Sequence, residues 1–253
     1  MRQKDFVLTL QNIESPILIT VPHGGMSNRY GSWLNTFFQK RIKSKDPKKN
    51  RIKGEKIVIG SDNQIFHVVS DILKEYQANA VVGLLPRSFV DYNRFVPEVA
   101  YADQKIKPFY DAYHENIKEI LLNLQTKHEQ VYLFDFHGFG IQPMEDKTFD
   151  IILGTNGESS PNGLDKFFYN YLKREYEIFC AGMDDLPGES ELYKGDTTNL
   201  FYFREFKNLE SMLVEISPKF RSTKILGAES YGKKLALDLA CFFKELEIRS
   251  LAL

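Results

Sequence analysis

The stretch Ile17-Leu18-Ile19-Thr20-Val21-Pro22-His23-Gly24-Gly25 decides the fold expected for this chain. Its first five residues are apolar or β-branched, a composition typical of a buried strand. Pro22 has no N–H to give to a sheet, so the strand should end there, and the glycines that follow permit a loop. In open α/β sheets, ligands bind beyond the carboxyl ends of the strands, which is where this pattern places His23.

A second stretch repeats the design. Val131-Tyr132-Leu133-Phe134-Asp135-Phe136-His137-Gly138 is an apolar strand that ends in Asp-x-His-Gly. The chain has five histidines, and two of them occupy matched strand–His–Gly contexts. Together they indicate a metal site. The alternative is that each is an ordinary polar residue at the end of a strand.

Short apolar runs alternate with segments of helical periodicity along the chain. This alternation predicts a three-layer α/β/α sandwich with a mixed, mainly parallel sheet, in one domain over residues 1–253. The expected strands are 6–10, 17–21, 80–85, 131–136, 149–153, 176–180 and 211–216. The expected helices are 33–41, 65–73, 108–124, 163–177 and 227–248.

We expect a cytoplasmic enzyme. We expect it to be a monomer or a homodimer. The net charge of −1 gives no reason to expect nucleic acid or an acidic membrane surface as a partner. The basic run 40–56 is interpreted as a solvated loop, with nucleic-acid binding as the less favoured alternative. Two cysteines make no disulfide framework, and Cys241 is expected in the core. No apolar run reaches the ~18–20 residues of a membrane span, and the N-terminus lacks a signal-peptide core.

Asp62 is the best candidate for a third metal ligand. A catalytic zinc usually takes three protein ligands of the His, Asp or Glu type and leaves a position open for water. Asp62 follows Gly60-Ser61 and stands just before a helical pattern, so its side chain can point into the cleft. The alternative is an ordinary helix N-cap, which the sequence alone favours. His67 and His114 lie within helical patterns and are interpreted as packing or supporting groups.

Glu215 interrupts the apolar run Met212-Leu213-Val214-Glu215-Ile216. A buried carboxylate without a partner is costly, so it should be paired or face a polar cavity. Beside a metal it would suit the role of general base and acid. The alternative is an outward-facing residue on an edge strand.

Arg87 and Asn93-Arg94 follow the expected strand 80–85. The planar fork of arginine binds a carboxylate through two hydrogen bonds, which lysine cannot match. These arginines can therefore hold an anionic substrate and a developing oxyanion. The alternative is a salt-bridged pair at the surface.

Eight motifs occur in a fixed order over roughly residues 17–220. They are Val21-Pro22-His23-Gly24-Gly25, Ser61-Asp62, Arg87 to Arg94, Phe109 to His114, Asp135-Phe136-His137-Gly138, Ile152-Leu153-Gly154, Tyr193 to Thr198 and Val214-Glu215-Ile216-Ser217. Together they resemble the N-formylglutamate amidohydrolase family, a branch of the zinc carboxypeptidase-like hydrolases. Departures from the family pattern are Gly24 and Gly138 at its serine positions, Lys194-Gly195 at its Gly-Gly, and Lys219 at its arginine.

The resemblance implies a zinc carboxypeptidase-like (phosphorylase/hydrolase-like) fold and one Zn²⁺ per chain. It implies cleavage of an amide bond in a small acidic N-acyl amino acid such as N-formylglutamate or a related compound. The implied roles are metal ligands for His23, Asp62 and His137, general base for Glu215, carbonyl polarisation for Arg87, and substrate binding for Asn93, Arg94, Gly195 and Thr198.

Two other functions are compatible with these residues. One is a carboxypeptidase-like or γ-glutamyl hydrolase that acts on a longer peptide; a lid formed by residues 182–200 would favour the small substrate instead. The other is a non-catalytic ligand-binding protein that keeps the fold. Glu215 argues against the second, because a binding module needs no general base in its cleft.

Overall fold

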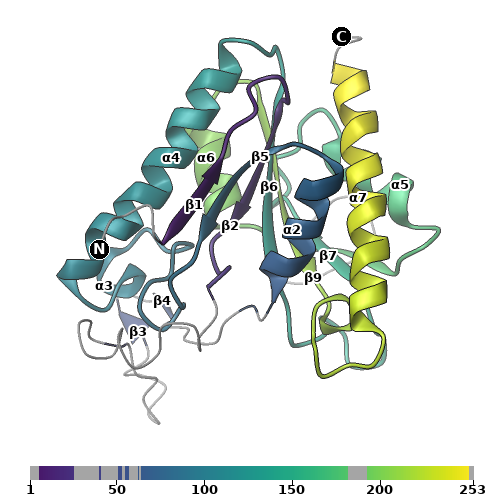
Figure 1. Cartoon of the computed structure of the whole chain (residues 1–253), viewed down its shortest axis with the longest axis horizontal. Coiled ribbons are helices and arrows are strands. Elements are labelled where there is room, and N and C mark those ends of the chain that lie inside the picture. The colour runs from purple at the N-terminus through teal and green to yellow at the C-terminus, as the bar shows by residue number, and fades with distance from the viewer. Residues whose placement is uncertain are drawn as a thin grey trace.

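The computed structural model describes residues 6–25, 40, 51–52, 55–56, 62, 64–181 and 193–250 (Figure 1). Seven strands form one sheet in the order β1-β5-β2-β6-β9-β7-β8, and β3 and β4 form a separate hairpin-like pair. The strands are β1 (Val7–Leu10), β2 (Ile17–Val21), β3 (Arg51–Ile52), β4 (Glu55–Lys56), β5 (Asn79–Gly83), β6 (Val131–Gly138), β7 (Ile151–Gly154), β8 (Ile178–Ala181) and β9 (Leu209–Ile216).

The sheet is mixed. Strands β5, β2, β6 and β9 are mutually parallel and occupy its middle. Strand β1 runs antiparallel to β5 at one edge, and β7 runs antiparallel to β9, with β8 parallel to β7. The carboxyl ends of the four parallel strands therefore lie side by side, at the same end of the sheet.

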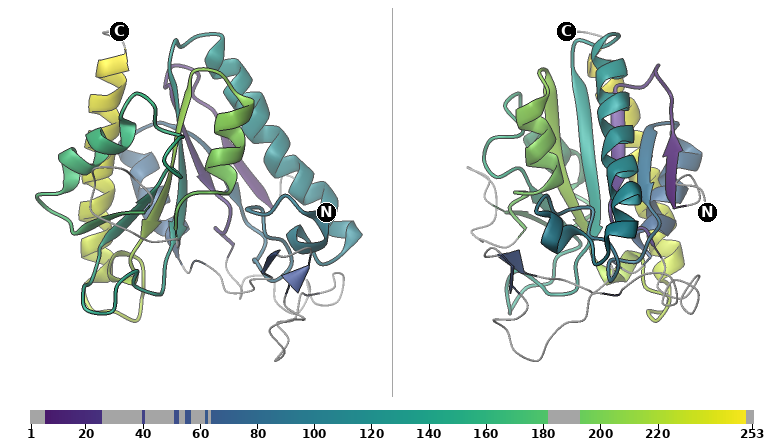
Figure 2. Two further views of the ribbon diagram at one scale, coloured as in Figure 1. Left: turned by 180° about the vertical axis from the view of Figure 1, so that it is seen from behind. Right: turned by 90° about the vertical axis from the view of Figure 1, so that its left-hand side faces the viewer.

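Helices cover both faces of this sheet (Figure 2). Helices α2, α5 and α7 share one apolar core with the sheet, and α4 and part of α6 share the other. The helices are α2 (Ile65–Glu75), α3 (Pro97–Ala100), α4 (Lys107–Gln125), α5 (Leu164–Leu172), α6 (Thr198–Glu205) and α7 (Ala228–Ser250), with the 3₁₀ turns η3 (Gln104–Ile106) and η4 (Pro218–Phe220). The expected three-layer α/β/α fold is confirmed.

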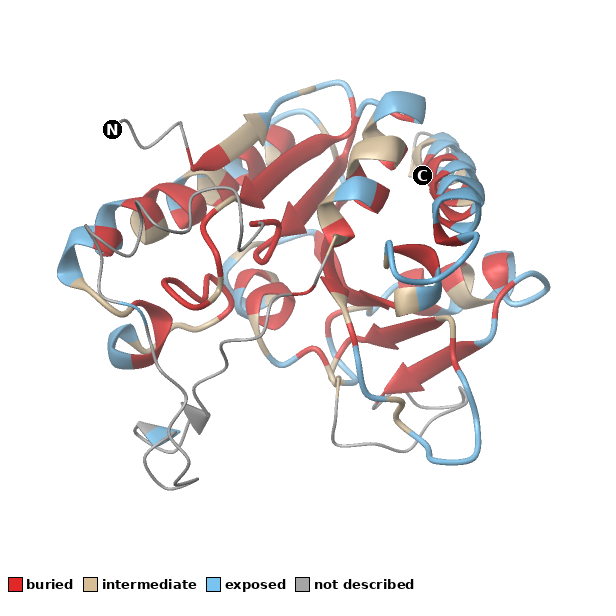
Figure 3. Ribbon diagram, turned by 60° about the horizontal axis from the view of Figure 1, so that its bottom comes forward, coloured by how far each residue is buried: buried red, intermediate tan, exposed pale blue. Residues whose placement is uncertain are grey.

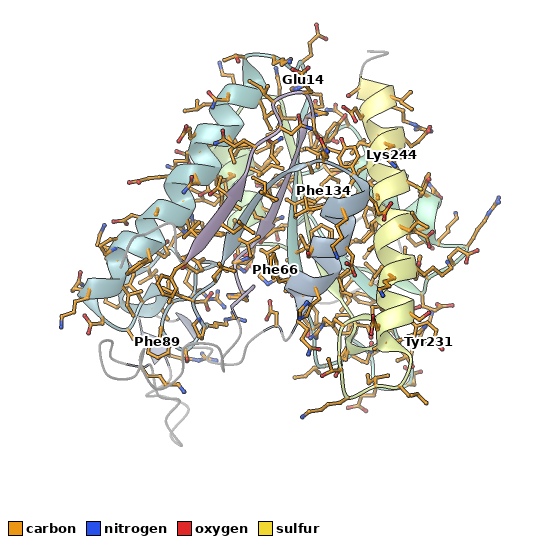
Figure 4. The ribbon with its side chains drawn as sticks, viewed as in Figure 1. Glu14, Phe66, Phe89, Phe134, Tyr231 and Lys244 are labelled. Atoms are coloured by element: carbon orange, nitrogen blue, oxygen red, sulfur yellow. The ribbon has the colours of Figure 1, made fainter. Side chains whose placement is uncertain are left out.

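The strand sequences explain why both faces are covered. Strand β2 is buried along its whole length, as the parallel strands of a three-layer fold must be, and Figure 3 shows the main strands in the colour of buried residues. Phe134 of β6 lies in the interior, whereas Lys244 lies on the outer side of α7 (Figure 4). Side chains of a strand alternate between faces, so Phe134 and Phe136 pack toward α7 while Leu133 packs toward α4.

The same alternation places the polar residues. Asp135 and His137 continue the row of Leu133, so they lie on the α4 and α6 face of β6, at its carboxyl end. On β9, Met212, Val214 and Ile216 join the α7 core, so Glu215 also lies on the face of α4 and α6. On the face covered by α4 and α6, the apolar core therefore gives way to these polar residues at the carboxyl ends of the strands.

Every expected strand, and every expected helix that falls within the described residues, is found, with bounds that differ by a few residues. Helix α5 ends at Leu172 rather than at residue 177. The helices α3 and α6 and the short strands β3 and β4 were not expected. Cys241 is exposed, so its expected place in the core is wrong: it lies on the outward side of α7. The expected helix 33–41 and most of the basic run 40–56 lie outside the described residues.

No helix among the described residues is long and apolar enough to cross a membrane.

Candidate metal centre

The candidate site lies where the parallel strands end. His23 stands two residues after the end of β2, and His137 and Glu215 are the next-to-last residues of β6 and β9. His137 and Glu215 are direct partners in the parallel pairing of β6 with β9. Paired residues project to the same face of a sheet, so the register alone brings this imidazole and this carboxylate together.

Asp62 joins the two histidines. Its Oδ2 atom lies 2.9 Å from Nδ1 of His23 and 2.9 Å from Nδ1 of His137. Helix α2 begins at Ile65 after Gln64, and no side chain caps it. The N-cap interpretation of Asp62 is therefore wrong, and its carboxylate faces the histidines instead. Ligand atoms of these three buried residues all lie within 4.8 Å of one another.

Each histidine contacts a second buried carboxylate through its other ring nitrogen. Nε2 of His23 lies 2.8 Å from Oδ1 of Asp91, and Nε2 of His137 lies 3.0 Å from Oδ2 of Asp135. Asp91 and Asp135 are fully buried, and Thr20 donates a further hydrogen bond of 2.6 Å to Asp135. No role for these two aspartates was predicted from the sequence. Asp135 had a visible signal, because residues two apart on a strand share a face.

The donor set fits a metal cation. Each imidazole has a carboxylate oxygen at both of its nitrogens, but a neutral imidazole carries only one N–H. With that N–H donated to the outer aspartate, both Nδ1 lone pairs and one oxygen of Asp62 converge on one place. Such convergence of acceptors requires a proton or a cation between them. Two histidines and a carboxylate are a set that zinc accepts.

The charges of these groups support one another. Burial opposes ionisation of Asp62, but the neighbouring His23 and His137 hold its pKa well below the ordinary value. Burial likewise disfavours the charged form of His137, yet the charge of Asp135 and the hydrogen bonds to Asp135 and Asp62 raise its pKa well above the ordinary value. The buried carboxylates around the two histidines therefore stabilise positive charge between them.

Glu215 is 8% exposed, and β9 lies between β6 and β7 in the sheet. The edge-strand interpretation is therefore wrong. Its Oε2 atom has no hydrogen-bond partner among the described residues. Burial, helped by the charge of Asp62, raises the pKa of Glu215 to about 7, although the charges of His137 and of the arginines oppose this rise. A carboxylate near neutrality with an unengaged oxygen is suited to proton transfer.

Asp91 connects the arginines to the histidines. Arg87 donates from Nε to Oδ2 of Asp91 over 2.9 Å, and its Nη1 lies 3.5 Å from Oδ1 of Asp62. Nε of Arg94 lies 3.9 Å from the same oxygen of Asp91. The side chain of Arg87 is 12% exposed and Asp91 is fully buried, so the surface-pair interpretation is wrong for Arg87.

Of the remaining predicted residues, Asn93 lies beside His137 and is bonded to the start of α6. Oδ1 of Asn93 accepts hydrogen bonds from the N–H of Thr198, over 3.0 Å, and from its hydroxyl. The Nδ2 atom of Asn93 lies 3.5 Å from Nε2 of His137. Gly195 has φ +77°, which suits glycine, and it packs against the backbone of Gly154 at the end of β7. Residues 182–192, most of the expected lid, lie outside the described residues.

The other histidines named from the sequence lie elsewhere. His114 is buried in α4, its Nδ1 lies 2.7 Å from the hydroxyl of Tyr202, and burial lowers its pKa to about 3. It is the packing group that its helical spacing predicted. His67 is exposed on α2.

Comparisons with known proteins agree with the fold. No protein-family profile matches the sequence, and no curated protein matches it. A gene product of Agrobacterium tumefaciens gives a TM-score of 0.59 with 14% identity, over 98% of this chain and 95% of that one.

The N-formylglutamate amidohydrolase from Ralstonia eutropha is also similar. Its TM-score is 0.63 with 14% identity, over 95% of this chain and 98% of that chain. The expected resemblance is thus found among the structural neighbours, and the chain has the fold of an N-formylglutamate amidohydrolase.

Proposed function

We propose that this protein is a zinc-dependent amidohydrolase that cleaves an amide bond in a small acidic N-acyl amino acid, such as N-formylglutamate or a related compound. The observation that carries the proposal is the convergence of His23, Asp62 and His137 beside the buried Glu215. The fold shared with an amidohydrolase supports it.

The three ligands would hold one zinc ion per chain, through Nδ1 of His23, Nδ1 of His137 and the carboxylate of Asp62. The outer contacts with Asp91 and Asp135 fix the orientation of both imidazoles and make them better ligands, as carboxylates behind metal-binding histidines do. When bound, zinc would supply Lewis acidity, which lowers the pKa of water and polarises a carbonyl.

Glu215 would move the proton. Its Oε2 atom takes a proton from the attacking water and later gives that proton to the departing amide nitrogen. Both transfers need a carboxyl group whose pKa lies near the working pH, which burial provides here. The register with His137 keeps the carboxylate beside the ligand set during both steps.

The charge of the site favours an anionic substrate. Among the described residues around the histidines, four carboxylates face three guanidinium groups, so a divalent cation would leave one positive charge in excess. They are Asp62, Asp91, Asp135, Glu215, Arg87, Arg94 and Arg221. An excess of positive charge in a partly buried site attracts a substrate carboxylate and disfavours a cationic one.

The basic and polar residues of the site have different roles in binding the substrate. Arg87 polarises the scissile carbonyl, since Asp62 and Asp91 hold its guanidinium beside the ligand set. Arg94, whose side chain is 26% exposed, binds the substrate carboxylate with help from Asn93. Gly195 and Thr198 form the wall of the substrate pocket on the α6 side; the hydrogen bonds from Thr198 to Asn93 support this placement.

The test is hydrolysis of a panel of N-acyl amino acids by the purified protein. The panel contains N-formyl and N-acetyl derivatives of acidic and neutral amino acids, together with γ-glutamyl peptides. We expect hydrolysis of the acidic N-acyl compounds, its loss after chelation, and its return with Zn²⁺. Hydrolysis of the longer γ-glutamyl peptides alone would support the alternative substrate class. Activity that survives complete removal of metal would contradict the proposal.

A further inference from the structure

Arg221 is a buried cation just beyond the strand that carries Glu215. It follows η4 and is 9% exposed. Its Nε donates a hydrogen bond of 2.9 Å to the carbonyl of Ile216, and its Nη2 donates one of 2.5 Å to the carbonyl of Phe139. The first of these carbonyls belongs to β9 and the second to the segment directly after β6.

These two carbonyls flank the reacting groups. Ile216 is the residue after Glu215, and Phe139 stands two residues after His137. A single guanidinium therefore joins the end of the strand with the proposed base to the end of the strand with a metal ligand. Because the fork of arginine is planar and rigid, this bridge also fixes the angle between the two ends.

Gly138 provides the space for this bridge. A Cβ atom at residue 138 would lie 2.5 Å from Cζ and 2.5 Å from Nε of Arg221, and 2.9 Å from Nη2. The guanidinium thus lies directly on the backbone between His137 and Phe139. Gly138 does not have a positive φ, so the requirement is for space and not for conformation.

We propose that Arg221 is a positioning residue for Glu215, and that Gly138 is needed because any side chain there would displace the guanidinium. This inference rests on the proposed function, because the group being positioned is the proposed base. The charge of Arg221 also interacts favourably with Glu215 and with Asp62. The bridge therefore acts on the base through both geometry and charge.

A double-mutant cycle tests the pair. Arg221→Ala and Gly138→Ala should each lower kcat by about 10- to 100-fold, because small displacements of a reacting group cost rate steeply. The zinc content and KM should stay close to wild type. The double variant should be no worse than Arg221→Ala alone, since both changes remove the same bridge. Arg221→Lys should not restore kcat, because an ammonium group cannot reproduce the fork.

Two controls and a stability measurement separate positioning from a general loss of structure. Lys219→Ala removes an exposed cation two residues away, paired with Asp150, and should leave kcat unchanged. Added guanidinium ion should raise the kcat of Arg221→Ala and should not affect Gly138→Ala, where the space is filled. Thermal unfolding of the four proteins should show the same non-additivity without any substrate.

The outcomes are distinct. Additive losses in kcat and in stability, a rise of KM with unchanged kcat, or loss of zinc in Arg221→Ala would each overturn the inference. If wild-type protein with bound metal hydrolyses nothing in the panel, the proposed function fails, and the inference about the base fails with it. An active wild type with an additive cycle would remove the inference alone.

Discussion

The burial of Glu215 lowers the stability of the fold, but the same carboxylate is the proposed general base. Its carboxylate is buried in a central strand, and one of its oxygens has no partner among the described residues. Glu215→Gln keeps the shape of the side chain and removes its ability to accept a proton. We expect a fall of about 10²-fold or more in kcat, the usual worth of general-base catalysis, with zinc content unchanged. Loss of zinc in this variant would instead make Glu215 a ligand.

The same residue predicts a dependence of stability on pH in the metal-free protein. The unfolded chain releases this proton near the ordinary value of 4.5, while the folded protein holds it until about pH 7. The folded state binds more protons in this window, so the contribution of Glu215 to the unfolding free energy falls as the pH rises. Glutamine cannot ionise. The Tm of Glu215→Gln relative to wild type should therefore be higher at pH 8 than at pH 5; an equal difference at both pH values would contradict this.

Arg94 should recognise a carboxylate. Hydrogen bonds to charged groups contribute about 1.5–3 kcal/mol, so Arg94→Ala should lower kcat/KM by about 10- to 150-fold for substrates with a free carboxylate. The effect should nearly vanish for their methyl esters, and Arg94→Lys should recover only part of it. Equal losses for acids and esters would show that Arg94 only holds its loop in place.

At the scale of single residues, the two histidines and the proposed base could be singled out from the sequence, but the places of the aspartates around them could not. His23, His137 and Glu215 each interrupt or end an apolar strand, which is a local signal. Asp91 and Asp62 contact His23, which lies 68 and 39 residues away from them in the chain. A local sequence pattern cannot predict contacts over such separations. For Asp62 the local pattern even favoured a helix cap.

At the scale of elements, α6 shows where the sequence pattern fails. Leu200, Phe201, Tyr202 and Phe203 are consecutive, so the segment has neither the helical nor the alternating period. The start of α6 is bonded to Asn93, 105 residues away, rather than by a local cap. Long amphipathic helices such as α4 and α7 could be predicted because their own periodicity determines the buried face.

The bond between Asn93 and Thr198 makes a prediction about this element. Thr198→Val removes a fully buried hydroxyl that donates to Asn93, and it should lower the unfolding free energy by about 0.5–1.5 kcal/mol. Thr197→Val is the matched control, because its side chain makes no capping bond. Chemical denaturation of both variants measures the difference, and equal stability of the two would contradict the assigned role.

At the scale of the whole molecule, the three layers could be predicted from the sequence. For the strand directions, only a mainly parallel sheet could be predicted. The alternation of strands and helices predicted the sandwich. The rule that ligands bind beyond the carboxyl ends of the strands predicted the end of the sheet where His23, His137 and Glu215 lie. The antiparallel strands β1 and β7 could not be assigned from the sequence, because a short apolar run reads the same in either direction. That residues 1–253 form a single domain stays a prediction.

Zinc content tests the central claim most directly. Purified protein, freed of metal by chelation and then reloaded, should bind about one Zn²⁺ per chain, as three-ligand catalytic sites do. His23→Ala and His137→Ala should each lose most of this zinc, whereas His67→Ala, which changes an exposed histidine of α2, should keep it. Mass-spectrometric metal analysis and calorimetric titration give the stoichiometry. Unchanged zinc content in both His23→Ala and His137→Ala would contradict the metal centre on which the proposed function depends.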